Sequence, residues 1–292
     1  MIIAPAVLAG LAAGAAVFVG TLVAVYLLLR GGGSFDRMAR EAAGLPTAVG
    51  EQKPLLYDEL LDKARSLALR PAPLPSPLQG EVVRVREQVD ADLDALFRIS
   101  NGEPRSGVYG DFGFDADELI WRYLPCGPFP SLAAFRDEFA SESVDARRLT
   151  LCDRSGQFVI GTLALGAHSP RDLRVEIQDL WLAPAFQGSS RTGVLTETVL
   201  LVLGYLFDAS YRRVEWRCDG HNVRARRAAH SLGLSFEGVL RKHRIVKESN
   251  CDSVVFAAIN SEWPVLRDHL TMRLRQATSA LAEAEAEDKK SR

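Results

Sequence analysis

The chain has 292 residues, of which 47% are apolar and 25% charged, and its formal net charge at pH 7 is -2. This composition is typical of a globular protein and excludes a disordered or fibrous one. Because basic and acidic residues are interspersed, the sequence lacks the strong basic field that attracts nucleic acid, and no nucleic-acid partner is expected. The cysteines and histidines show no metal-ligand spacing, so no metal is expected either.

Residues 2–29 contain no charged side chain and are long enough, as a helix, to cross the roughly 30 Å hydrocarbon layer of a membrane. A cleaved signal peptide and a buried helix of a soluble domain are the alternatives. We favour an uncleaved anchor, because a signal peptide needs a basic start and a shorter apolar region. Arginines follow the span but do not precede it, so a single-pass protein with its body in the cytoplasm is predicted. The spacing of Gly10 and Gly14 would allow two such helices to pack as a homodimer.

The rest of the chain divides where the composition changes. A short amphipathic helix is predicted at Tyr57–Leu69, and the alternating prolines of Arg70–Pro77 predict an extended spacer. Beyond Gly80, apolar patterns of strand and helix alternate, which predicts an α/β domain. The expected divisions are a transmembrane anchor (1–30), a juxtamembrane segment and Pro-rich linker (31–79), a folded domain (80–265) and a C-terminal helical tail (266–292).

Within the folded domain, apolar runs bounded by turn residues mark the expected elements. The predicted strands are Val82–Val85, Leu149–Asp153, Phe158–Leu165, Val175–Leu182, Arg213–Cys218 and Ser253–Ile259. The predicted helices are Asp90–Ser100, Val194–Phe207 and Val223–Leu232.

A polar loop, Gln187–Gly193, joins the strand at Val175–Leu182 to the apolar helix at Val194–Phe207. The free N–H groups at a helix start, reached through small residues, can bind a phosphate. A simple turn is the alternative, since Gly and Ser are common in turns.

Several motifs in chain order strengthen the phosphate interpretation. They are Trp121–Phe129, Arg212–Asn222 running on to Ala225–Ala229, Leu232–Arg241, Lys247 with Asn250 and Asp252, and Asn260–Pro264. Together they resemble the GNAT superfamily of N-acetyltransferases, in the branch similar to the Rim-type enzymes that acetylate the N-termini of ribosomal proteins. The resemblance covers about Gly80 to Pro264. It implies a mixed α/β fold with a mostly antiparallel central sheet flanked by helices, preceded here by one N-terminal transmembrane helix.

The resemblance also implies acetyl-CoA as co-substrate, held where a splayed strand leaves backbone groups free. The implied cofactor-binding residues are Leu180, Trp181 and Leu182 for the pantetheine arm, Gln187, Gly188, Ser189, Ser190, Arg191 and Thr192 for the diphosphate, and Asn222.

Acetyl transfer to an amine needs a proton acceptor, and Glu176 and Asp179 are the candidates on the central strand. Three residues apart, they lie on opposite faces of a regular strand, unless a bulge changes the phase. Glu176 is favoured, because it matches a Glu-Ile pair of the family; a solvated carboxylate without a catalytic role is the alternative. Ala229 stands where many relatives carry a proton-donating tyrosine, so no general acid is assigned. Tyr123 and Trp121 are either acceptor-pocket residues or core aromatics.

The expected function is therefore transfer of an acetyl group from acetyl-CoA to a primary amine, which is a protein N-terminus, a lysine or a small amine. The alternative is a catalytically silent acyl-CoA-binding or scaffold module held at a membrane.

Overall fold

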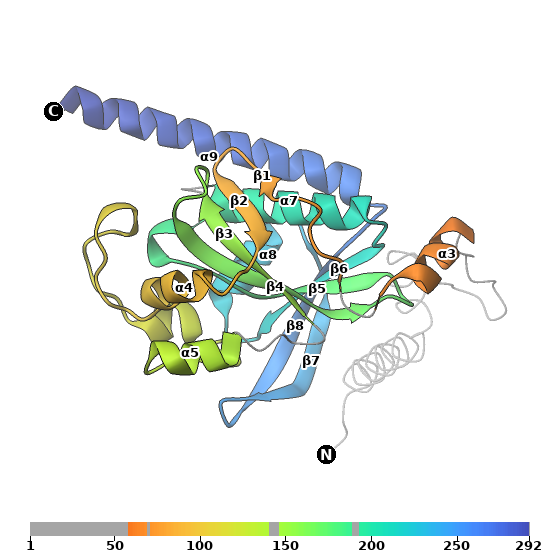
Figure 1. Cartoon of the computed structure of the whole chain (residues 1–292). Helices are drawn as coiled ribbons and strands as arrows, with labels where there is room; N and C mark the ends of the chain where they lie inside the picture. Colours follow the sequence, from red (N-terminus) through yellow and green to blue (C-terminus); the bar gives the residue numbers. More distant parts are fainter. Residues whose placement is uncertain (1–57, 69–70, 140–145, 189–192, 292) are drawn as a thin grey trace, which may run out of the picture. The chain divides into compact units, whose positions relative to one another are not determined.

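The computed structural model describes residues 58–68, 71–139, 146–188 and 193–291, which belong to one compact unit, Asp58–Arg292 (Figure 1). The helices are α3 (Asp58–Ser66), α4 (Asp92–Ser100), α5 (Leu132–Phe139), α7 (Val194–Asp208), α8 (Val223–Ser231) and α9 (Trp263–Ser291). The strands are β1 (Leu78–Gln79), β2 (Val83–Glu87), β3 (Arg147–Asp153), β4 (Val159–Ser169), β5 (Arg174–Leu182), β6 (Arg213–Asp219), β7 (Ser235–Val246) and β8 (Ser249–Ile259).

The strands form one 8-stranded sheet in the order β1-β2-β3-β4-β5-β6-β8-β7. β5 and β6 run parallel, whereas the other neighbouring pairs are antiparallel. Helices flank this sheet, with α7 on one side and α4 and α5 on the other (Figure 1). The predicted mixed and mostly antiparallel α/β fold is thereby confirmed.

Two hydrophobic clusters hold the layers together. The larger cluster packs β2 to β6 and β8 against α7, α8 and α9, and includes Leu203 and Leu206 of α7. The smaller cluster packs α4 and α5 against the opposite side, around Trp121, which ends a π-helical turn at Asp117–Trp121. Trp121 is buried, and its indole N–H donates to the Ser100 carbonyl at 2.9 Å. This partner satisfies the one polar atom of a core side chain.

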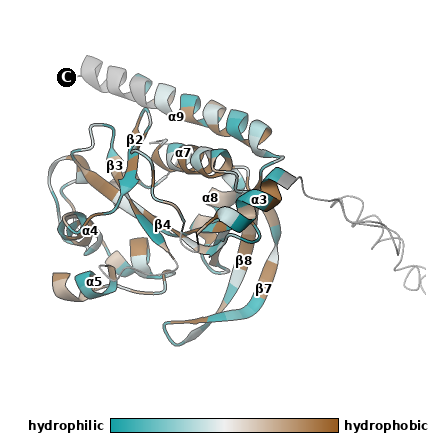
Figure 2. Ribbon diagram, turned by 45° about the vertical axis from the view of Figure 1, so that its right-hand side comes forward, coloured by the Kyte–Doolittle hydropathy of each residue, from teal (hydrophilic) through white to brown (hydrophobic). Residues whose placement is uncertain are grey.

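Helix α7 illustrates how an apolar run becomes a buried element. Its sequence is apolar on nearly all sides, as Figure 2 shows, and a helix of that kind lies within a core. Glu197 is a charged exception, and this residue is nevertheless buried, with only 2% of its surface exposed. Its oxygens accept the backbone N–H groups of Glu81, Val82 and Val83 at 2.5, 2.7 and 2.8 Å. These bonds join α7 to the start of β2.

The predicted elements recur with small shifts in their boundaries, and the main omission is β7. This strand is exposed along most of its length, and with β8 it forms a hairpin that projects from the sheet (Figures 1 and 2). Its pairing with β8 shifts register twice, and Gly238 and Lys242 have positive φ values of 149° and 50°. These interruptions remove the regular alternation by which a strand is found in a sequence.

The Pro-rich segment, predicted to be a spacer, has contacts with the folded domain. The backbone N–H of Leu74 donates to a Glu87 carboxylate oxygen at 2.8 Å, and Arg147 Nε donates to the Pro71 carbonyl at 2.7 Å. Leu74 is itself part of the larger core cluster. The Pro-rich segment, which has few backbone N–H donors, therefore packs against the folded domain.

The predicted membrane localisation needs correction. Among the residues that the structure describes, no helix combines the length and the apolar character required to cross a bilayer. The single-pass assignment is therefore not retained. The predicted span itself, residues 2–29, lies outside the described residues, as do Gly10 and Gly14 of the predicted dimer contact.

Candidate active site

The two parallel strands at the centre of the sheet separate before they end. β5 and β6 pair from Arg174 opposite Arg213 to Ile177 opposite Trp216. Beyond Ile177, β5 continues beside β4, whereas β6 continues beside β8. The backbone groups that face the resulting gap have no ladder partner across it, so they can receive an extended ligand.

A β-bulge lies directly beyond the last parallel pair. On β4, Thr162 and Ala164 lie opposite Trp181 and Gln178, so three steps along β5 match two along β4. Asp179 lies in this interval and has a φ of 50°, in the left-handed region. An extra residue reverses the order in which side chains alternate between the two faces. Ile177 accordingly belongs to the larger core and Trp181 to the smaller one.

The bulge brings the two predicted bases to the same side of the sheet. Asp179 lies beside Arg148, whose guanidinium stacks on Phe139 of the smaller cluster. Glu176 precedes Ile177 of the larger cluster, so its side chain points to the opposite face, which is also that of the smaller cluster. The opposite placement expected of a regular strand therefore does not hold for Glu176 and Asp179.

Glu176 is a buried carboxylate with defined partners. It is 5% exposed, its Oε2 lies 2.7 Å from Arg217 Nη2, and it accepts a hydrogen bond from Gln178 Nε2 at 3.0 Å. Burial raises the pKa of Glu176 above its ordinary value, because desolvation penalises the charged form, while the Arg217 guanidinium opposes this change. A carboxyl group of raised pKa can accept a proton near neutral pH.

Asp179 is less enclosed and more weakly paired. Its Oδ2 lies 3.8 Å from Arg148 Nη1, and its side chain is 28% exposed. Burial raises the pKa of Asp179, and the positive charges of Arg148 and Arg244 oppose this effect. Asp179 is also adjacent to Leu180, a residue that lines the cavity described next.

A cavity of about 640 Å³ opens where β5 and β6 diverge. Its wall includes six of the residues predicted to bind the cofactor, namely Leu180, Trp181, Leu182, Gln187, Gly188 and Asn222. Neither Glu176 nor Asp179 belongs to this wall. Ser189, Ser190, Arg191 and Thr192, the remainder of the predicted phosphate loop, lie outside the described residues.

The cavity wall has distinct apolar and basic components. Leu119, Leu124 and Trp216 contribute apolar surface, together with Leu180 to Leu182. Arg224, Arg227 and Arg273 contribute cationic groups, and the described part of the wall contains no acidic side chain. Such a wall fits a ligand with an apolar arm and an anionic group.

Asn222 has a structural partner at the start of α8. Its side-chain oxygen accepts the backbone N–H of Ala225 at 3.0 Å, which is the bond of a helix N-cap.

The remaining residues singled out in the sequence lie in different places. Trp121 lies in the smaller core, whereas Tyr123 lines the cavity. Ala229 is fully buried within the larger core and carries no proton donor.

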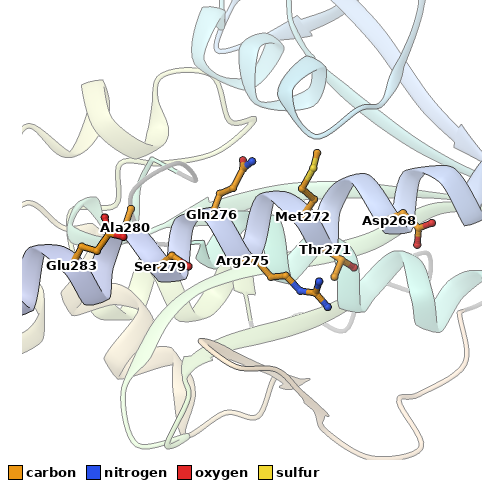
Figure 3. A pocket seen from close by; sticks show the side chains of 8 residues that line it. All are labelled: Asp268, Thr271, Met272, Arg275, Gln276, Ser279, Ala280 and Glu283. Carbon is orange, nitrogen blue, oxygen red and sulfur yellow. The ribbon is translucent and has the colours of Figure 1, made fainter.

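A second hollow lies along α9, but its form differs. Figure 3 shows that all eight side chains lining it come from α9 alone. They include both Asp268 and Arg275, so no single charge predominates. A furrow along one helix offers no converging groups, and we assign no ligand to it. Among the described residues, no cluster of three or more His, Cys, Asp or Glu side chains is placed to hold a metal ion.

Comparisons with known proteins agree with this geometry. Residues 84–235 match the acetyltransferase (GNAT) domain family, and this match spans more than half of the chain. A GCN5-related N-acetyltransferase from Brucella melitensis is 31% identical over 72% of this chain and 90% of its own, with a TM-score of 0.61. A GNAT-family protein from Chromobacterium violaceum is 28% identical over 74% of this chain and 98% of its own, with a TM-score of 0.60.

A more distant likeness concerns the Rim-type enzymes. The ribosomal L7/L12 alpha-N-protein acetyltransferase RimL is 15% identical over 63% of this chain and 94% of its own, with a TM-score of 0.52. At that identity the likeness shows the fold alone. No curated protein matches the chain significantly.

The fold and the family match define an acyl-group transferase built around a splayed central sheet. The chain belongs to the GNAT family of acetyltransferases. The family fold binds acetyl-CoA and an amine acceptor. The predicted resemblance is thereby confirmed, and RimL is among the structural neighbours.

Sequence reasoning did not identify the three arginines of the cavity wall. Arg224 and Arg227 lie on α8, within a motif that carried the resemblance, whereas Arg273 lies on the helical tail outside the matched domain. A basic residue on a helix rich in charged residues does not by itself indicate a binding site. The position of Arg273 could have indicated one, because it lies between Leu270 and Leu274 on the apolar stripe of α9.

Proposed function

We propose that this protein transfers the acetyl group of acetyl-CoA to a primary amine: a protein N-terminus, a lysine side chain or a small amine. The observation that carries the proposal is the divergence of β5 and β6 beyond Ile177 and Trp216, which opens a cavity with an apolar part and a basic part. Acetyl-CoA has a matching form, since its pantetheine arm is largely uncharged and its phosphates are anionic.

In the proposed arrangement, backbone groups of Leu180 to Leu182 hold the pantetheine arm along the edge that β6 leaves free. Gln187 and Gly188, with Ser189 to Thr192, bind the diphosphate before the N-terminus of α7. Asn222 contributes by holding the start of α8 at the cavity wall.

The transfer forms a bond between the amine nitrogen and the acetyl carbon and breaks the bond between that carbon and sulfur. The amine loses a proton, and the leaving thiolate gains one. Asp179 is the proposed proton acceptor, because its side chain is more exposed than that of Glu176 and it directly precedes Leu180 of the cavity wall. Glu176 is the other candidate, and its pairing with Arg217 and Gln178 equally suits a role in holding the strand.

Tyr123 is the proposed proton donor. Among the described residues of the wall it supplies the only phenol, and the buried Ala229 cannot take this role.

A catalytically silent acyl-CoA-binding module is the second candidate function, and it is favoured by the lack of a proton donor at Ala229.

The test measures CoA release and amine acetylation by the full-length protein. Acceptors are a peptide with a free N-terminus, an N-blocked lysine peptide and a polyamine, and mass spectrometry identifies the product. We expect one acceptor class to be acetylated and Asp179→Asn to lower kcat/KM about 100-fold or more. Binding of acetyl-CoA without transfer to any acceptor would favour the silent module.

Matched variants separate the two carboxylates. Glu176→Gln keeps the size of the side chain, and Asp94→Asn changes an exposed carboxylate of α4 that lies outside the cavity wall. A larger loss of kcat/KM in Glu176→Gln than in Asp179→Asn would assign the proton acceptor to Glu176. Tyr123→Phe is expected to lower kcat more than it raises KM, since a proton donor acts on the leaving group.

A further inference from the structure

Arg273 stands on the inward face of the C-terminal helix. Leu270, Leu274 and Ala277 mark the buried stripe of α9, with exposed fractions of 0%, 6% and 4%. Residues three and four apart share one side of a helix, so Arg273 and Ala277 face the same way. A cation in that position is unusual, because arginine is rarely placed on a core-facing stripe without a partner.

The Nε atom of Arg273 is buried and has no hydrogen-bond partner among the residues that the structure describes. A buried N–H group that lacks an acceptor lowers the stability of the folded protein. Such a group on a cavity wall is explained when a ligand supplies the acceptor. Arg273 does line the cavity between β5 and β6, on the wall that also carries Gln187 and Gly188.

Helix α9 passes close to the start of α7. A Cβ atom added to Gly193, the N-cap of α7, would lie 3.0 Å from Leu274 Cδ1 and 3.5 Å from Ala277 Cβ. The residues that follow Arg273 therefore contact the point where the phosphate loop enters its helix. One turn before Arg273, His269 Nε2 lies 3.1 Å from the Ser231 carbonyl at the end of α8. These contacts fix α9 against both helices of the cavity.

We propose that Arg273 of the C-terminal helix binds the diphosphate of acetyl-CoA. This inference rests on the proposed function. Arg224 and Arg227 are exposed on α8, whereas Arg273 adjoins Leu274 and hence the N-terminus of α7, the end of a helix that favours an anion. The guanidinium supplies two parallel N–H donors to phosphate oxygens, and the ligand gives the buried Nε an acceptor. The tail helix is thus part of the cofactor site.

The test measures binding of CoA to the full-length protein by calorimetry. Arg273→Gln is expected to weaken binding roughly 10- to 100-fold, the usual effect of losing a charge-assisted hydrogen bond. Arg273→Lys should recover part of the affinity, because it keeps the charge without the planar fork. Arg275→Gln removes the same charge from the exposed face of α9 shown in Figure 3 and should change the affinity less than twofold.

Dephospho-CoA, which lacks the 3′-phosphate, locates the contact. For a diphosphate contact, Arg273→Gln weakens CoA and dephospho-CoA by the same factor. If the loss appears with CoA but not with dephospho-CoA, the diphosphate assignment is overturned in favour of the 3′-phosphate. Equal affinities of wild type and Arg273→Gln for CoA overturn the proposal entirely.

Thermal unfolding without ligand distinguishes binding from a structural role. Since no described group of the protein accepts a hydrogen bond from the Nε, Arg273→Gln should leave the melting temperature unchanged or raise it. A lower melting temperature together with weaker binding would assign Arg273 a structural role instead. If wild type binds CoA and acetylates no amine, the proposed function fails while the Arg273 proposal stands; if wild type does not bind CoA, both fail.

Discussion

Ile177 of β5 and Trp216 of β6 form the last parallel pair of the central sheet, immediately before the bulge at Asp179. The end of this pairing sets where the cavity begins, and Trp216 lines that cavity. The bulge turns Asp179 to the side of Glu176, while Leu180 and Trp181 line the cavity. One change of register therefore determines both the position of the cofactor site and the side on which the carboxylates lie.

The substitution Asp179→Asn should increase the free energy of unfolding at pH 7. Burial raises the pKa of Asp179 in the folded protein above its unfolded value, so the charged carboxylate at neutral pH costs stability, which asparagine restores. As the pH falls through the folded pKa and then the unfolded pKa, aspartate becomes neutral and the difference disappears. Urea unfolding between pH 3 and pH 8 measures this trend, with Asp94→Asn on the surface as the control. A destabilised Asp179→Asn protein at pH 7 would contradict it.

Much of the fold could be predicted from local patterns. The apolar run beginning at Val194 predicts a buried helix to Phe207, and the structure has it to Asp208. The strand predicted from Val175 to Leu182 begins one residue earlier. These elements are recognisable because the apolar period matches the face that each element buries. The hairpin strand β7 lacks such a face, and no sequence period indicates it.

The site was harder to predict, because it depends on register and on contacts between distant segments. The spacing of Glu176 and Asp179 in the sequence does not predict the bulge. The bulge is recognised only in the structure, from the left-handed φ of Asp179. The contact between Arg273 and the cavity needs α9 to lie beside the start of α7, which the sequence of the tail does not specify. The predicted base and the predicted phosphate loop stay predictions until binding and kinetics are measured.

Replacing Glu197 by alanine should destabilise the protein strongly. The substitution leaves the backbone N–H groups of Glu81, Val82 and Val83 without their acceptor, the first two in part-buried positions and the third in a buried one. We expect a loss of about 3 kcal/mol or more, since each orphaned donor costs roughly 1–3 kcal/mol. Chemical denaturation measures the loss, and Glu81→Ala at the exposed neighbouring side chain is the control. Equal stability of both variants would show that these bonds contribute little.

The side chain of Asn222 is expected to act mainly as the N-cap of α8. Asn222→Ala should lower the free energy of unfolding by about 1 kcal/mol, because the Ala225 N–H loses its acceptor. Asn222→Ser keeps a capping oxygen and should restore most of the stability. If Asn222→Ser is stable but binds acetyl-CoA much more weakly than wild type, the amide contacts the cofactor directly.

Cys126 and Cys218 should react slowly with thiol reagents in the native protein. Burial raises the pKa of each thiol to about 11. At pH 8 only about one thiol in a thousand is then ionised, and the thiolate is the reactive form. Cys126 and Cys218 are partly buried and Cys152 and Cys251 are buried, so little modification is expected before unfolding. The rate of disulfide exchange with an aromatic disulfide, measured in buffer and in denaturant, tests this difference. Fast reaction of the native protein would mean that a thiol is exposed or activated, and it would also add a background to any assay that detects released CoA by its thiol.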